Sequence, residues 1–112
     1  MFIKEITCIL NEIGMCKKLK GYHYLLFVID EIILGGFCPN INLTYENVGK
    51  IFGTKKENIE RNIRYAIENT WEQGNVNEIY NLFGYTVDKE KGKPTNSEFI
   101  FLIADKIKLK KS

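Results

Sequence analysis

Hydrophobic residues recur at helical spacing along most of this chain, and glycines interrupt the pattern at intervals. Residues 2–13 carry one such stripe, which Gly14 ends. A second segment, residues 21–34, is apolar nearly all round and ends at Gly35. A helix that is hydrophobic on all sides belongs in the interior, so we expect this segment to be the central helix of the core.

Two helix signals with a glycine between them follow in the middle of the chain. Thr44 can cap a short helix over 45–52, which Gly53 breaks. Thr54 can then start a longer helix, because Glu57 lies three residues on and gives the spacing of a capping box. The spacing predicts a helix-turn-helix.

The longer of these two helices, over about 55–72, has two different faces. Its apolar stripe consists of Ile59, Ile63, Ala66 and Ile67, which we expect to pack against the helix over 21–34. Its polar and cationic side consists of Lys55, Lys56, Asn58, Arg61, Arg64 and Tyr65. A buried stripe opposite a cationic, hydrogen-bonding stripe is typical of a recognition helix, so the motif covers about 44–73.

Two further helices are predicted in the C-terminal third. Asn75 can cap a short helix that Gly84 ends. Thr95 and Glu98 repeat the capping-box spacing and start a last helix through 99–107. With six helices and no convincing strand, the chain is predicted to be an all-α domain spanning residues 1–112 as one unit.

Charge is distributed unevenly along this chain of 112 residues, although its net charge is only +2. Residues 50–64 carry five cations against two acids, and residues 106–111 carry four lysines and no acid. Both segments are candidate phosphate-facing surfaces. The longest apolar run, residues 24–29, is too short to span a bilayer, and no signal peptide is visible. We therefore expect a cytoplasmic protein with no membrane partner.

The residues that could carry catalysis or bind metal are sparse. Cys8, Cys16 and Cys38 are odd in number and lack close-pair spacing, which indicates reduced thiols, with Cys8 packed in a helix. His23 is the only histidine and is expected to be a partly buried helix residue. There is no nucleophile with a base, no metal constellation and no phosphate-binding glycine loop. An enzyme, a cofactor and a metal site are therefore not expected.

Several strings of this sequence resemble the C-terminal DNA-binding effector domain of the stage-zero sporulation response regulator. They include Lys20-Gly21-Tyr22, Ile59-Glu60-Arg61, Leu82-Phe83-Gly84-Tyr85-Thr86-Val87 and Lys93-Pro94-Thr95-Asn96-Ser97-Glu98-Phe99-Ile100. The resemblance covers nearly the whole chain. It implies a six-helix fold and binding to short boxes in double-stranded promoter DNA. It also implies contact with a sigma factor of RNA polymerase, through about 75–83, and self-association on tandem boxes.

The resemblance assigns Glu60, Arg61 and Arg64 to the DNA face. The sequence departs from the family pattern at several positions, where Asn58 replaces an arginine, Tyr65 a histidine, Glu46 a proline and Gly49 an alanine. The family's receiver domain is absent from these residues. The chain is therefore either a fragment or a stand-alone divergent copy, and the scattered departures favour the divergent copy.

The chemistry of the DNA-face residues suggests different roles. An arginine fork matches the two acceptors of guanine, whereas Asn58 suits adenine and predicts a shifted or relaxed base preference. Glu60 could accept from a cytosine amino group or orient an arginine through an ion pair, and we favour the orienting role. Lys93 could touch a phosphate or remain a solvated loop lysine.

A second interpretation of the same residues does not involve DNA. A copy that has lost specific DNA binding could act as an interaction module that pairs with the full-length regulator. Salt dependence separates the two interpretations, because phosphate contacts weaken as salt rises.

Overall fold

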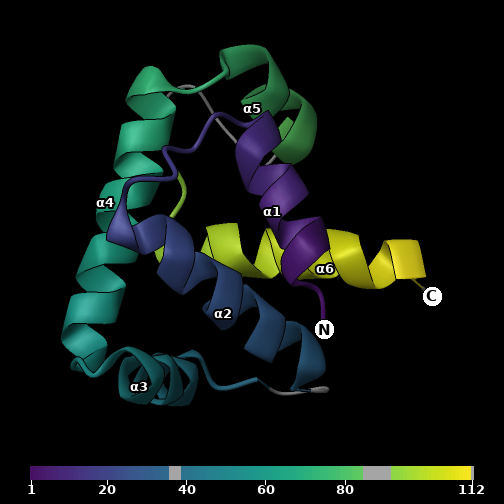
Figure 1. The fold of residues 1–112 in the computed structure, drawn as a ribbon. Coiled ribbons are helices and arrows are strands. Elements are labelled where there is room, and N and C mark those ends of the chain that lie inside the picture. The colour runs from purple at the N-terminus through teal and green to yellow at the C-terminus, as the bar shows by residue number, and fades with distance from the viewer. Residues whose placement is uncertain (36–38, 85–91, 112) are drawn as a thin grey trace.

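The computed structural model describes residues 1–35, 39–84 and 92–111, and the described residues form six helices without any strand (Figure 1). The prediction of an all-α, six-helix fold is confirmed. None of these helices is long and apolar enough to cross a membrane. They are α1 (Ile3–Glu12), α2 (Lys20–Leu34), α3 (Ile41–Phe52), α4 (Lys56–Gln73), α5 (Val76–Phe83) and α6 (Asn96–Lys111).

Helix α2 lies at the centre of the fold, as its uniform hydrophobicity predicts. It packs against α1, α3, α4 and α6, and its Leu25, Val28 and Ile29 are completely buried. Figure 1 shows α2 and α6 side by side in the middle of the molecule, with α4 along one edge. The arrangement leaves one long side of α4 facing outward.

Helix α4 is the longest helix, with 18 residues, and it is anchored on its apolar stripe. Ile59, Ile63 and Ala66 are fully buried and Ile67 is 1% exposed, which confirms the predicted core face. The close packing of α4 on α2 depends on Gly21. A Cβ atom at that position would lie 2.2 Å from the backbone oxygen of Asn62, so only a glycine lets the two helices approach this closely.

The first helix of the predicted motif begins earlier than the sequence suggested, and the Thr44 cap is wrong. Helix α3 begins at Ile41, and the side chain of Asn40 caps it by accepting from Leu43 N at 3.1 Å. Thr44 lies inside the helix, buried, with its hydroxyl donating to Asn40 O. Asparagine is at least as good an N-cap as threonine, and the earlier start adds a turn in which Ile41 packs against the core and Thr44 is buried.

The capping box predicted at Thr54 is also wrong, because Thr54 still belongs to the end of α3. Gly53 adopts the left-handed conformation with φ 69°, which lets the Thr54 amide donate to Gly49 O at 2.8 Å. Lys55 takes the N-cap position of α4, without a side-chain cap, and Glu57 lies exposed in the first turn. The turn therefore closes α3 before α4 starts.

The two C-terminal caps are confirmed. The side chain of Asn75 accepts from Glu78 N at 3.2 Å and starts α5. At the start of α6 the box is reciprocal: Glu98 N donates to the Thr95 hydroxyl at 3.2 Å and Thr95 N donates to the Glu98 carboxylate at 3.0 Å. This cap fixes the first turn of α6 beside the middle of α4.

Candidate nucleic-acid interface

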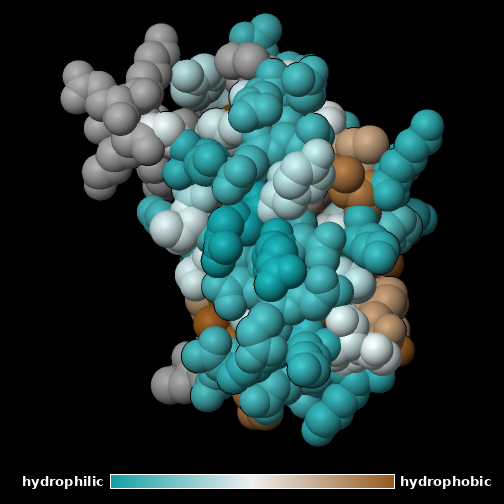
Figure 2. All heavy atoms as spheres, turned by 90° about the vertical axis from the view of Figure 1, so that its left-hand side faces the viewer, coloured by the Kyte–Doolittle hydropathy of each residue, from teal (hydrophilic) through white to brown (hydrophobic). Residues whose placement is uncertain are grey.

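The outward side of α4 is a hydrophilic strip that covers the height of the molecule (Figure 2). Arg61 and Tyr65 are both exposed there, four residues apart on the same side of the helix. Among the described residues, Arg61 forms no ion pair. The helix therefore presents one uncompensated guanidinium and a phenol at the middle of the strip.

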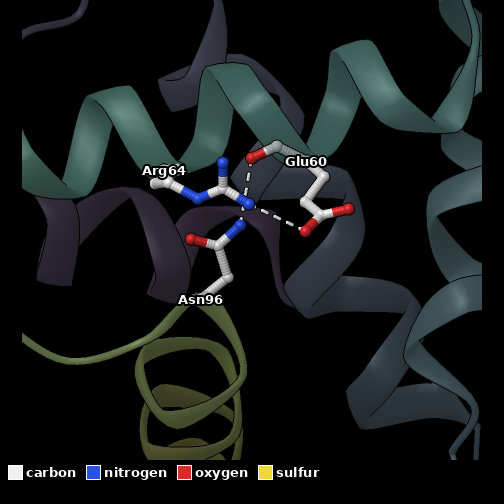
Figure 3. Close-up of polar contacts among 3 residues, drawn as sticks. All are labelled: Glu60, Arg64 and Asn96. Carbon is white, nitrogen blue, oxygen red and sulfur yellow. Dashed lines mark hydrogen bonds and ion pairs between the residues drawn. The ribbon is translucent and has the colours of Figure 1, made fainter.

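Arg64 is held by Glu60 on one edge of this strip. One guanidinium nitrogen of Arg64 donates to Glu60 Oε1 at 2.9 Å, and both side chains are about half exposed. From the start of α6, Asn96 Nδ2 donates to the backbone oxygen of Glu60 at 3.0 Å (Figure 3). The ion pair expected from the i, i+4 spacing is thus formed, and α6 fixes the turn that carries it.

Asn58 lies in a ladder of polar side chains along the first turns of α4. Its Nδ2 donates to Thr54 Oγ1 at 3.0 Å. The Nδ2 atom of Asn62 donates to Asn58 Oδ1 at 3.0 Å and to Asn58 O at 2.8 Å. Each end of the Asn58 amide is therefore engaged once within the protein, which leaves the second hydrogen of Nδ2 and the second lone pair of Oδ1 for a further partner.

The two lysines at the start of α4 are in different environments. Lys56 Nζ lies 3.7 Å from Glu46 Oε1 on α3, so this cation is partly compensated. Lys55 is exposed and forms no ion pair with any residue in the described ranges. It stands at the N-terminus of α4, where no side chain caps the free amides and the helix dipole is positive.

Lys93 reaches the strip from the segment that precedes α6. Its Nζ lies 3.6 Å from Glu68 Oε1 on α4. Between this segment, α3 and α4 lies a cleft of about 560 Å³, lined by Tyr45, Arg64 and other residues. Burial raises the pKa of the Tyr45 hydroxyl, which its hydrogen bond with Asn96 only partly offsets, so the phenol stays neutral at physiological pH.

The C-terminal lysines do not join this surface. Lys106 and Lys110 line a different cleft, together with Glu5, Ile9 and other residues of α1 and α5. The part of α6 that carries them extends away from α4 (Figure 1). Of the two cationic segments found in the sequence, only the one at residues 50–64 belongs to the face of α4.

Two minor predictions about single residues need correction. Cys8 is exposed on α1 rather than packed, because it lies outside the stripe formed by Ile6 and Leu10. His23 is a helix residue but exposed, with Nε2 lying 2.9 Å from Lys17 O. Cys38 lies outside the described residues.

The sequence predicted the exposed side of α4, but it did not predict which side chains of the protein bond to the residues there. The Asn58–Asn62 contact has an i, i+4 spacing and could have been found in the sequence. The carboxylates that compensate Lys56 and Lys93, and the amide of Asn96, come from positions that local spacing does not reveal.

Comparison with known protein families agrees with the resemblance found in the sequence. The model of the family described as sporulation initiation factor Spo0A, C terminal, matches residues 6–107. The chain belongs to this family, whose members are DNA-binding effector domains of transcription factors. The matched range includes all six helices except the first residues of α1 and the last of α6.

Proposed function

We propose that this member of the family is a sequence-specific transcription regulator that inserts α4 into the major groove of promoter DNA. The observation that carries the proposal is the pairing of a fully buried isoleucine stripe with an exposed strip on the opposite side of α4. A major groove about 12 Å wide admits such a helix, and side chains of the outward strip then meet the base edges.

Within this proposal the strip divides into readers and positioning residues. Arg61 and Arg64 read bases through their guanidinium forks, and Glu60 orients Arg64 before DNA arrives. Tyr65 is exposed enough to contact a base or a sugar. Lys55, Lys56 and Lys93 contact phosphates, Lys55 most strongly because it carries no compensating carboxylate in the described residues.

The proposal extends to the partners that the family resemblance implies. A sigma factor of RNA polymerase would be contacted through α5, where Asn77, Tyr80 and Asn81 are exposed. Self-association on tandem promoter boxes would place two copies side by side on one duplex. Binding to a single box requires neither contact. The titrations proposed for this chain therefore use duplexes with a single box.

Removing the guanidinium of Arg64 tests base reading. We expect Arg64→Ala to weaken binding to a family promoter box by roughly 1–3 kcal/mol, because the variant cannot form a bidentate pair of hydrogen bonds with a base. Arg64→Lys keeps the charge but not the fork, so it should reduce selectivity while keeping the salt dependence. Fluorescence anisotropy titrations on the box and on a random duplex, at several salt concentrations, measure both quantities.

Two results would contradict this assignment. Equal reductions in affinity on the box and on random DNA for Arg64→Ala would mean that Arg64 contacts phosphate and not a base. A chain that shows no salt-dependent preference for the box at all would contradict the proposed function, and would favour an interaction module instead.

Phosphate contacts at the start of α4 give a separate prediction. Lys55→Ala should weaken binding to every duplex and lower the slope of log K against log salt by roughly 0.9. Lys56→Ala should do less, because Glu46 already compensates Lys56. The matched variant Glu46→Gln removes that carboxylate and should strengthen binding to all sequences alike. If Lys55→Ala changes selectivity for the box while leaving the salt slope intact, Lys55 contacts a base and our assignment is wrong.

A further inference from the structure

Three exposed lysines lie where the connection from α1 joins α2, outside the surface to which the proposed function assigns DNA binding. Lys17 and Lys18 precede α2, and Lys20 is its first residue. Within the described part of the chain, none of the three forms an ion pair. In contrast, Lys56, Arg64 and Lys93 around α4 each face a glutamate. We call Lys17, Lys18 and Lys20 the flank lysines.

The flank lysines are held beside α4 by the close contact of α2 with α4 at Gly21. Gly21 directly follows them, and a Cβ there would lie 2.2 Å from Asn62 O and 2.7 Å from the Cβ of Ala66. The connection is ordered by hydrogen bonds from Leu19 N to Cys16 O and from Tyr22 N to Leu19 O, at 3.3 and 3.2 Å. Figure 1 shows this connection crossing in front of α4 before α2 begins.

The position relative to the outward strip decides what these lysines can reach. Asn62 contacts α2 at Gly21, and Glu60 contacts Asn96 at the start of α6. These two residues lie on opposite sides of α4. The exposed Arg61 and Tyr65 lie between these two sides. A helix in the major groove has a row of phosphates on either side, so a cation beside α4 faces one of these rows.

We propose that Lys17, Lys18 and Lys20 bind the phosphates on one wall of the groove that α4 occupies, an inference that rests on the proposed function. The ligand class is the sugar-phosphate backbone of duplex DNA. Because these ammonium groups have no internal carboxylate partner in the described residues, their charge is fully available to displace counterions. The contacts add affinity on every sequence and leave base selectivity to the strip on α4.

The test replaces all three flank lysines by glutamine in the full chain. The matched control, Lys4→Gln with Lys106→Gln and Lys110→Gln, removes the same charge from α1 and from the half of α6 away from α4 (Figure 1). We expect the flank variant to lower the salt slope by roughly 0.9 for each phosphate that the lysines no longer neutralise. Affinity should fall on the order of tenfold or more at low salt, equally on the box and on a random duplex. The affinity of the control should change little.

Several outcomes would overturn the inference. An unchanged salt slope in the flank variant, beside normal binding by the unmodified chain, overturns the inference alone. Equal reductions in the flank and control variants also overturn it, since net charge then explains both. No DNA binding by the unmodified chain overturns the proposed function as well. Circular dichroism verifies that each variant is folded, and the single pair Lys18→Gln and Lys4→Gln gives the same comparison if a triple variant unfolds.

Discussion

Replacing Gly21 by alanine is expected to lower the free energy of unfolding by about 3 kcal/mol, at the upper end of the usual cost of adding a methyl group to a packed core. The new Cβ would lie 2.2 Å from the backbone oxygen of Asn62, far inside van der Waals contact. A flexible side chain could move aside, but this oxygen belongs to the middle of α4. Relief therefore requires α2 and α4 to separate, which opens the core where Ile59 and Ile63 are fully buried.

Urea denaturation followed by circular dichroism measures this destabilisation, with Gly35→Ala as the matched control. Gly35 is exposed at the end of α2 with φ −79°, so an alanine fits its backbone. Its Cβ would lie 3.1 Å from Glu31 O, a tight contact that a shift of a few tenths of an ångström at this exposed helix end relieves, and we expect a change within about 0.5 kcal/mol. A similar stability for both variants would mean that α2 and α4 can separate slightly at little cost, against the packing described here.

Sequence periodicity predicted the helices well because burial imposes it. The stripe from Ile59 to Ile67 and the uniform hydrophobicity of residues 21–34 are direct consequences of which faces meet in the core. The helix ends were predicted less well, because only two of the four predicted caps are present. Asn75 and Thr95 act as the predicted caps.

The two caps that failed, at Thr44 and Thr54, each had a competing arrangement nearby. Asn40 offers an equally good cap one turn before Thr44, and packing of Ile41 against the core favours the longer helix. At Thr54, the left-handed Gly53 directs the amide back to Gly49, which removes Thr54 from the start of α4. Local propensity cannot rank such alternatives, because tertiary contacts decide between them.

The candidate site shows the same division between local and distant information. The Glu60–Arg64 pair was foreseeable because both residues lie on one helix, four apart. The compensation of Lys56 by Glu46 depends on the angle between α3 and α4. The contact of Asn96 with Glu60 joins residues 36 apart in sequence and depends on how α6 docks. Periodicity therefore identified the strip, whereas its electrostatic balance required the fold.

Replacing Asn58 by arginine is expected to give the largest gain in DNA affinity. The family resemblance places an arginine here, and the asparagine of this chain is a shorter, neutral side chain. Each end of its amide already forms one hydrogen bond, to Thr54 or to Asn62, and turning the amide toward a base loses these bonds. Arginine adds a cation at the groove and a fork that matches guanine. The added charge and the base contact both strengthen DNA binding, and the base contact alone contributes on the order of 1–3 kcal/mol to the binding free energy.

Titrations of the family box and of its single-base substitutions measure this gain, with Asn58→Ala as the control. If the amide only bridges Thr54 and Asn62, alanine should cost a little stability and leave the base preference unchanged. Asn58→Arg should then create a preference for guanine at one position that the unmodified chain lacks. Full selectivity of the unmodified chain at that position would contradict this expectation. So would a shift away from adenine in Asn58→Ala, since the amide would then leave its ladder to read the base.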